Sequence, residues 1–436
     1  SDNTAVGDNA GGAITTGTTS VAVGSAALLL ATTGARNVAV GYQALDAATT
    51  ADNNTAIGAE ALGANTSGTQ NVAVGTYALD ANTTANNNTG MGYNALTANT
   101  TGASNSAFGQ SALEANTTAS NNTAVGAEAL KANTTGTDNV AVGSNAADAN
   151  TTGSDNTAIG DNALGANTTA DYNTAVGADA LATNTTGATN DAFGYYALQA
   201  NTTGSTNVAV GSRALMANTT ADANTAVGRD ALKANTTASN NTAVGYAALT
   251  ANTTGTENVA VGTNALDAQT TGGSYNTAVG FDAMTANTTG QHQVAVGRKA
   301  LDANTTGTKN VAIGGSALGA NTTGDNNIAV GVDTLDHNTT GGYNTAVGMQ
   351  ALTANTTANN NVAMGYNSLQ ANTTGAANVA LGKDALYSNT TASNNVAIGL
   401  DALQANTTGT ANVAVGANSL DASDTADQNT GIGYNA

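Results

Sequence analysis

The seventeen residues from Asn71 to Asn87 read NVAVGTYALDANTTANN, and this unit decides the fold. Stepping by 17 from Gly7 reaches glycine every time up to Gly262, and the same step from Gly280 reaches glycine up to Gly433. A period this short indicates a solenoid, in which each coil buries its apolar side chains only against neighbouring coils. Seventeen residues are too few for a two-helix repeat. They suit one coil of a parallel β-solenoid with two short strands and two turns.

The whole chain follows this period. We therefore predict an all-β protein, a parallel β-solenoid or β-roll of about 26 coils, as one continuous array over residues 1–436. One extra residue shifts the phase near 271–275. Because the array starts and stops within a unit, we expect it to be a segment of a longer fibre. Each position of the unit is named below after its residue in 71–87, and equivalent residues 17 apart form a column.

The apolar positions predict which side chains face a core. Alternate residues of a strand point to opposite faces, and the Val74 position holds Val, Ile, Leu, Met or Phe in every copy, which predicts a core position. The Ala73 position admits only Ala or Gly, which indicates a strand packed on both faces. The Val72 position accepts more residue types, which predicts that it lies at the solvent-exposed edge of the core. Leu79 recurs in a second expected strand, where Ala147 and Met284 depart from it and should leave or fill a gap.

Two small-residue positions have different meanings. The Gly75 position is glycine in every copy, including Gly41, Gly58, Gly92 and Gly109, which predicts a positive φ or a backbone contact that leaves no room for a Cβ. The Ala85 position holds glycine 16 times and alanine 9 times. Alanine is disfavoured in the left-handed region, so this position requires smallness rather than a left-handed turn.

Stacked coils place identical residues in line about 4.8 Å apart. The Asn71 column and the Asn82, Thr83 and Thr84 columns should therefore form polar ladders. The core of one chain is thin, since each coil offers one Val or Ile, one Leu and several Ala. We therefore expect several chains to share an axis as a rod, with a homotrimer favoured over a fibre bundle.

Composition excludes several classes of protein. The chain has no cysteine, hence no disulfide framework and no thiolate metal site, and no proline, which suits short coils in which nearly every residue is near a ladder. Nine basic residues against 29 acidic ones argue against nucleic acid as a partner. No run of about 20 apolar residues exists, so membrane insertion is not expected.

The stretch Asn54 to Ala61, NTAIGAEA, resembles the head repeat of trimeric autotransporter adhesins and is similar to repeats in phage tail-fibre shafts. The resemblance covers essentially the whole chain, although the unit here is longer than the usual adhesin coil. It implies a left-handed β-roll in which three chains form an extracellular rod that binds surfaces.

Catalytic chemistry has little support in the sequence. The two histidines, His292 and His337, belong to different coils and are expected to be solvated. The acidic residues lie at variable positions, such as Asp80 and Glu60, which indicates a solvated face, with weak Ca²⁺ binding as the alternative. We therefore predict no enzyme, no catalytic residues, no metal site and no cofactor.

Three surface features are candidates for interaction. Tyrosines that directly follow the recurring glycine either contact a surface or sugars, or cover a neighbouring turn; they include Tyr42, Tyr93, Tyr195, Tyr246 and Tyr366. Twenty coils carry an Asn-x-Thr/Ser sequon whose asparagine either bears a glycan or makes turn hydrogen bonds and ladders; they include Asn65, Asn82, Asn99, Asn116 and Asn133. The third feature is the paired Thr83 and Thr84 columns, which suggest ice binding, although adjacent residues of a strand point to opposite faces.

These observations predict a structural or adhesive fibre for surface attachment or display, located outside the cell, on the cell surface or on a virion. Its partners are then copies of itself and cell-surface or carbohydrate ligands. A phage tail-fibre shaft and an ice-binding solenoid remain alternatives.

Overall fold

The computed structural model describes residues 2–436. It is all-β, with 26 parallel strands that form a β-solenoid of about 25 turns and a 17-residue repeat, as the sequence predicts. The described residues contain no helix. The chain divides into two units, residues 1–221 and 222–436, and each is described by itself.

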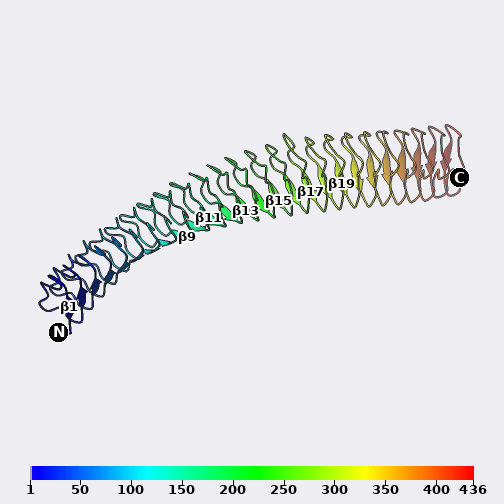
Figure 1. Cartoon of the computed structure of the whole chain (residues 1–436). Helices are drawn as coiled ribbons and strands as arrows, with labels where there is room; N and C mark the ends of the chain where they lie inside the picture. Colours follow the sequence, from blue (N-terminus) through cyan, green and yellow to red (C-terminus); the bar gives the residue numbers. More distant parts are fainter. Residues whose placement is uncertain (1) are drawn as a thin grey trace. The chain divides into compact units, whose positions relative to one another are not determined.

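In the first unit, consecutive coils are stacked with their strands side by side (Figure 1). The strands are β1 Thr4–Val6, β2 Val21–Val23, β3 Val38–Val40, β4 Thr55–Ile57, β5 Val72–Val74, β6 Thr89–Met91, β7 Ser106–Phe108, β8 Thr123–Val125, β9 Val140–Val142, β10 Thr157–Ile159, β11 Thr174–Val176, β12 Asp191–Phe193 and β13 Val208–Val210.

The second unit has the same construction (Figure 1). Its strands are β14 Thr225–Val227, β15 Thr242–Val244, β16 Val259–Val261, β17 Thr277–Val279, β18 Val294–Val296, β19 Val311–Ile313, β20 Ile328–Val330, β21 Thr345–Val347, β22 Val362–Met364, β23 Val379–Leu381, β24 Val396–Ile398, β25 Val413–Val415 and β26 Thr430–Ile432.

The strand register repeats the sequence period. In the first unit Ala56 pairs with Ala73, its equivalent in the next coil. In the second unit one pairing spans the extra residue, where Val259 of β16 pairs with Thr277 of β17. That residue lies in the turn at Gly272, which has a φ of 74° and no atom within 4 Å of the place where a Cβ would lie. A side-chain change accompanies it: Gln269 replaces the usual asparagine, and its Nε2 reaches the carbonyl of Gly273 across the longer turn.

Each coil contains one strand, so the prediction of a second strand around Leu79 is wrong. Overlapping turns occupy that segment: the amide of Ala78 donates to Gly75 O (3.3 Å), and that of Asn82 donates to Leu79 O (3.1 Å). Tyr77 and Leu79 have φ values of 61° and 53°, in the left-handed region that turns of this kind use. The Leu79 amide still bonds the next coil, at Ala95 O (3.0 Å), so the ladder between coils continues without a strand.

The two faces of the strand are the reverse of those predicted. Ala73 points into the coil and is fully buried, whereas Val72 and Val74 point outward and are partly exposed. The prediction that the Val74 position faces the core of the coil, with Val72 at its margin, is therefore wrong for the single chain. The reason is size, since the interior beside the strand is narrow enough to accept only Ala or Gly.

The interior of each coil is a thin mixed core. Ala73, Ala78 and Leu79 are fully buried, and they share the interior with the side chains of Asn71 and Asn82, which are also fully buried. The departures Ala147 and Met284 occupy the same buried position as Leu79. Burial of so many amides requires that each finds hydrogen-bond partners.

Both glycine interpretations agree with the backbone. Gly41, Gly58, Gly75, Gly92 and Gly109 have φ values of 141°, 138°, 137°, 144° and 144°, and a Cβ on each would overlap the carbonyl group of the equivalent glycine in the next coil. Both reasons for glycine thus apply at once. At the Ala85 position, by contrast, the glycines have no positive φ except for the neighbouring insertion at Gly272, so smallness alone is required there.

Candidate functional site

The first polar ladder is formed by the asparagines that lie directly before the strands. The backbone amide of Asn71 donates to Oδ1 of Asn54 in the preceding coil (2.9 Å), and the amide of Asn88 donates in turn to Oδ1 of Asn71 (2.9 Å). Asn71 Nδ2 crosses the coil and donates to the carbonyl of Ala85 (2.8 Å). Each buried asparagine therefore links one coil to the next and closes its own coil across the interior.

The second ladder is formed by the asparagines at the Asn82 position, each of which donates to the equivalent asparagine of the preceding coil. Asn82 Nδ2 donates to Asn65 Oδ1 (3.0 Å) and to Ala85 O (3.2 Å), and Asn82 Oδ1 accepts from Asn99 Nδ2 (3.1 Å). Where Ser423 replaces the next asparagine, Asn406 Oδ1 is buried without a partner. The ladders predicted for the Asn71 and Asn82 columns are present, whereas the one predicted for the Thr84 column is wrong, because the described residues of that column make no hydrogen bond to one another.

The second ladder also decides the surroundings of the sequon asparagines. They are fully buried, and their Nδ2 atoms donate to carbonyls inside the coil; they include Asn65, Asn82, Asn99, Asn116 and Asn133. In the folded coil these side chains make turn and ladder hydrogen bonds, and a glycan on Nδ2 has no space.

The two threonine columns are in different environments. Thr83 is partly buried, and its Oγ1 donates to the carbonyl of Thr100 in the next coil (3.2 Å). Thr84 is exposed, and its hydroxyl makes no hydrogen bond to the described residues. A water lattice would therefore meet one column of open hydroxyls rather than two.

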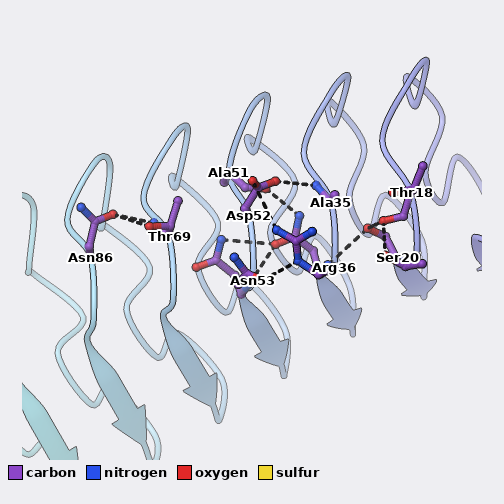
Figure 2. A network of polar contacts seen from close by, with 12 residues as sticks. Thr18, Ser20, Ala35, Arg36, Ala51, Asp52, Asn53, Thr69 and Asn86 are labelled. Atoms are coloured by element: carbon purple, nitrogen blue, oxygen red, sulfur yellow. Dashed lines mark hydrogen bonds and ion pairs between the residues drawn. The ribbon is translucent and has the colours of Figure 1, made fainter.

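A third set of polar contacts stabilises the corner before each strand (Figure 2). Asp52 Oδ1 accepts from the amide of Ala35 (2.7 Å), and Asn86 Oδ1 accepts from the amide of Thr69 (2.7 Å), each one coil back. Arg36 Nε donates to Asn53 Oδ1 (2.6 Å), and Arg36 Nη2 lies 3.9 Å from Asp52 Oδ2. These contacts are exposed or partly buried and join neighbouring coils at the surface.

The largest uniform surface feature is the outer face of the strands. At the Val74 position the exposed side chains include Phe108 at 39%, Ile159 at 40% and Leu381 at 43%. At the Val72 position the partly exposed residues are chiefly Val and Thr. Among the 26 described strands only β12 carries a charged residue, Asp191. We call this surface the strand face. The sequence did not predict this face, because the period of two in a strand does not show which side of the strand is inside.

The candidate tyrosines are outside the coil. Tyr42, Tyr93, Tyr195, Tyr246 and Tyr366 are 55%, 52%, 49%, 51% and 41% exposed. Some have aromatic or cationic neighbours: Tyr93 makes an edge contact with Tyr77 at 6.2 Å, and Arg229 lies 6.0 Å from the ring of Tyr246. Their spacing along the chain is irregular, so they form separate contacts rather than a continuous aromatic surface.

The acidic residues are scattered in the same way. Partial burial raises the pKa of Asp80, and the nearby Glu60 and Asp46 carboxylates raise it further. Burial also raises the pKa of Asp302 and Asp336 in the second unit. Within residues 2–436 no three His, Cys, Asp or Glu side chains are placed to hold a metal ion. The ring of His292 stacks on that of Tyr275, with the ring centroids 4.8 Å apart.

No family model matches the chain, and no curated protein matches its sequence. Over the described residues, 2–436, no helix is long and apolar enough to cross a bilayer.

Proposed function

We propose that this chain is part of an extracellular structural or adhesive fibre in which copies of the chain, three in our account, share an axis and pack through the strand face. The fibre would attach to or display from a cell surface or virion. The observation that carries the proposal is the strand face itself.

The strand face has the properties of a protein interface. Contiguous exposed apolar surface is uncommon on soluble monomers and marks sites of association. Here outward Val, Ile, Leu, Met or Phe side chains recur in the register of the coils, for example Ile57, Val74 and Met91 in β4 to β6. The thin interior adds a second reason, because Ala73, Ala78 and Leu79 bury little apolar area per coil. Packing of strand faces would add the burial that each coil lacks.

A repetitive fibre can bind a surface through many weak contacts along its length. Weak contacts by exposed side chains such as Tyr42 and Tyr93 would be individually small, and many along one fibre would combine by avidity. Cell-surface or carbohydrate ligands are the partners that exposed tyrosines suit best, because the ring can stack on a sugar while its hydroxyl stays hydrated.

The test replaces outward residues of three consecutive strands: Val125→Asp, Val142→Asp and Ile159→Asp. Because these side chains face outward, the fold of the coil should be retained, and its circular dichroism spectrum unchanged. Assembly, measured by sedimentation velocity, should be lost or strongly weakened. The matched control carries three aspartates on the same coils away from the strand face: Thr135→Asp, Thr152→Asp and Thr169→Asp. Equal assembly of the two triple variants would overturn the proposal.

Ice binding is a second candidate, favoured by one observation. Threonine occupies the outward Val72 position in 11 of the 26 strands, in register with Val at the same position, for example Thr55 beside Val72. A flat array of β-branched side chains is a surface on which water can order. Thermal hysteresis of the purified chain is the test, and a sample without activity would end this interpretation. A phage tail-fibre shaft would use the strand face in the same way as the adhesive fibre.

A further inference from the structure

The Thr84 column is the most uniform exposed position of the chain. It holds threonine in every copy except one, where Ser67 replaces it, and the residue is exposed in every copy. Other exposed positions vary freely: the Asn87 position holds Gln70, Ser104 and Asp138, all of them exposed. A hydroxyl is therefore retained at a surface position where the chain otherwise tolerates many side chains.

The fold does not use this hydroxyl. At the adjacent position, Thr83 Oγ1 donates to the carbonyl of Thr100 (3.2 Å), so the hydroxyl there has a structural role. No residue of the Thr84 column donates a side-chain hydrogen bond to the described residues, and only Thr254 accepts one, at 3.4 Å from the amide of Gly272 beside the insertion. The requirement for the hydroxyl thus comes from outside the coil.

The column is also independent of the asparagine sequon. In the first three coils Ile14, Ala31 and Ala48 replace the asparagine, yet Thr16, Thr33 and Thr50 keep the hydroxyl. Those coils contain no Asn-x-Thr sequence at this place. The threonine is therefore not retained as the second half of an N-glycosylation signal.

A comparison within the coil shows that the hydroxyl group itself is needed. At the Asn86 position a backbone amide of the preceding coil is satisfied by different acceptors, since Asp52, Asn86 and Ser120 all supply one, at 2.7, 2.7 and 3.0 Å. At the Thr84 position neither Asp nor Asn occurs. Ser67 shows that the methyl group can be absent, which a contact made through the methyl would not allow. What every member of the column shares is an accessible O–H.

We propose that the Thr84 column is a site of O-glycosylation, with a nucleotide-activated sugar as the donor. In this reaction the Oγ of the residue attacks the anomeric carbon of the sugar as the bond from that carbon to the nucleotide diphosphate breaks. The hydroxyl proton passes to a base of the transferase, and the nucleotide diphosphate leaves. The modified hydroxyls would form a line along each unit, about 4.8 Å apart at full occupancy. This inference does not rest on self-association through the strand face.

The test uses the full chain isolated from its own source, with peptide mapping by mass spectrometry and electron-transfer fragmentation. We expect sugar additions on the Thr84 column and none on the Thr83 column, which serves as an internal control in every coil. Peptides that contain residues of the Thr84 column should be heavier than their sequence masses. Unmodified peptide masses throughout residues 2–436, or additions shared equally between the two columns, would overturn the proposal.

A pair of variants expressed in the same source locates the site. Thr101→Val, Thr118→Val and Thr135→Val together should remove the additions of three coils while circular dichroism stays unchanged. The matched set Thr100→Val, Thr117→Val and Thr134→Val should keep all additions, because the exposed hydroxyls remain. Loss of the same mass from both sets would contradict the assignment.

Discussion

Removal of one amide from the middle of the second ladder should destabilise its coil more than removal of an amide at the end of that ladder. Asn116 Nδ2 donates to Asn99 Oδ1 (2.9 Å), and its Oδ1 accepts from Asn133 Nδ2 (3.0 Å). In Asn116→Ala, Asn99 Oδ1 loses its only donor and Asn133 Nδ2 keeps one of its two acceptors. Two buried polar groups are then left unsatisfied, at about 1–3 kcal/mol each, or roughly 2–6 kcal/mol in total.

The control is Asn65→Ala, at the start of the same ladder. Ala48 precedes it, so Asn65 accepts from Asn82 on one side and has no ladder partner on the other. Its removal leaves one unsatisfied group, with an expected cost of about 1–3 kcal/mol, half that of Asn116→Ala. Both variants make the same chemical change in a fully buried side chain.

The assay is native-state hydrogen exchange followed by mass spectrometry. A long repeat array does not unfold in one step, so the opening free energy of the coils around each substitution is the relevant quantity. Coils in the other unit provide the reference within the same molecule. Equal losses at the two sites, or losses below about 0.5 kcal/mol at both, would refute the idea that cooperative amide pairing holds the coils together.

Three further outcomes are expected. Gly75→Ala should lower the opening free energy of its coil by at least about 1–3 kcal/mol, because of its positive φ and the overlap of the new Cβ with the next coil. Gly68→Ala should lower it less, because Gly68 has no positive φ and nine coils already carry alanine at this position, although its Cβ would also approach Ala85 O; similar exchange in the two variants would contradict this. Ala147→Leu should stabilise by about 0.5–2 kcal/mol by filling the buried leucine position, and slower exchange of the adjacent coils is the check. Burial raises the pKa of Asp80 in the folded state. The protonated carboxyl therefore stabilises the fold fully below the ordinary carboxyl pKa of about 3.9, and this stabilisation is lost as the pH rises through the folded-state pKa. The coils around Asp80 should therefore exchange more slowly near pH 4 than at pH 7, after correction for intrinsic rates, and Asp80→Asn should flatten that difference.

The sequence predicts the parts of this fold that depend on repetition. The period sets the coil, the parallel register and the columns. The uniform glycine at the Gly75 position predicts a positive φ or a contact that excludes a Cβ, and the structure has both. The buried ladders also follow, because Asn71 and Asn82 recur at one position and stacking brings equivalent residues together.

The orientation of the strand was not predictable from alternation alone. Val74 is the larger side chain, and a pattern of large apolar residues normally indicates the core. The signal that could have corrected this is the size limit at Ala73, which is typical of a position enclosed by its own coil. The turns at Tyr77 and Leu79 were missed for another reason: residues with side chains rarely adopt a positive φ, so propensity favours a strand there.

If the strand faces of several chains pack around a shared axis, the mass per unit length of the fibre reports how many chains it contains. One chain of 42.1 kDa and 436 residues has a mass of about 1.6 kDa per coil, or about 0.34 kDa per ångström at a spacing of about 4.8 Å. Scanning transmission electron microscopy of the unlabelled protein should give about three times that value. A uniform population at the single-chain value would show separate chains with exposed strand faces and would contradict the account.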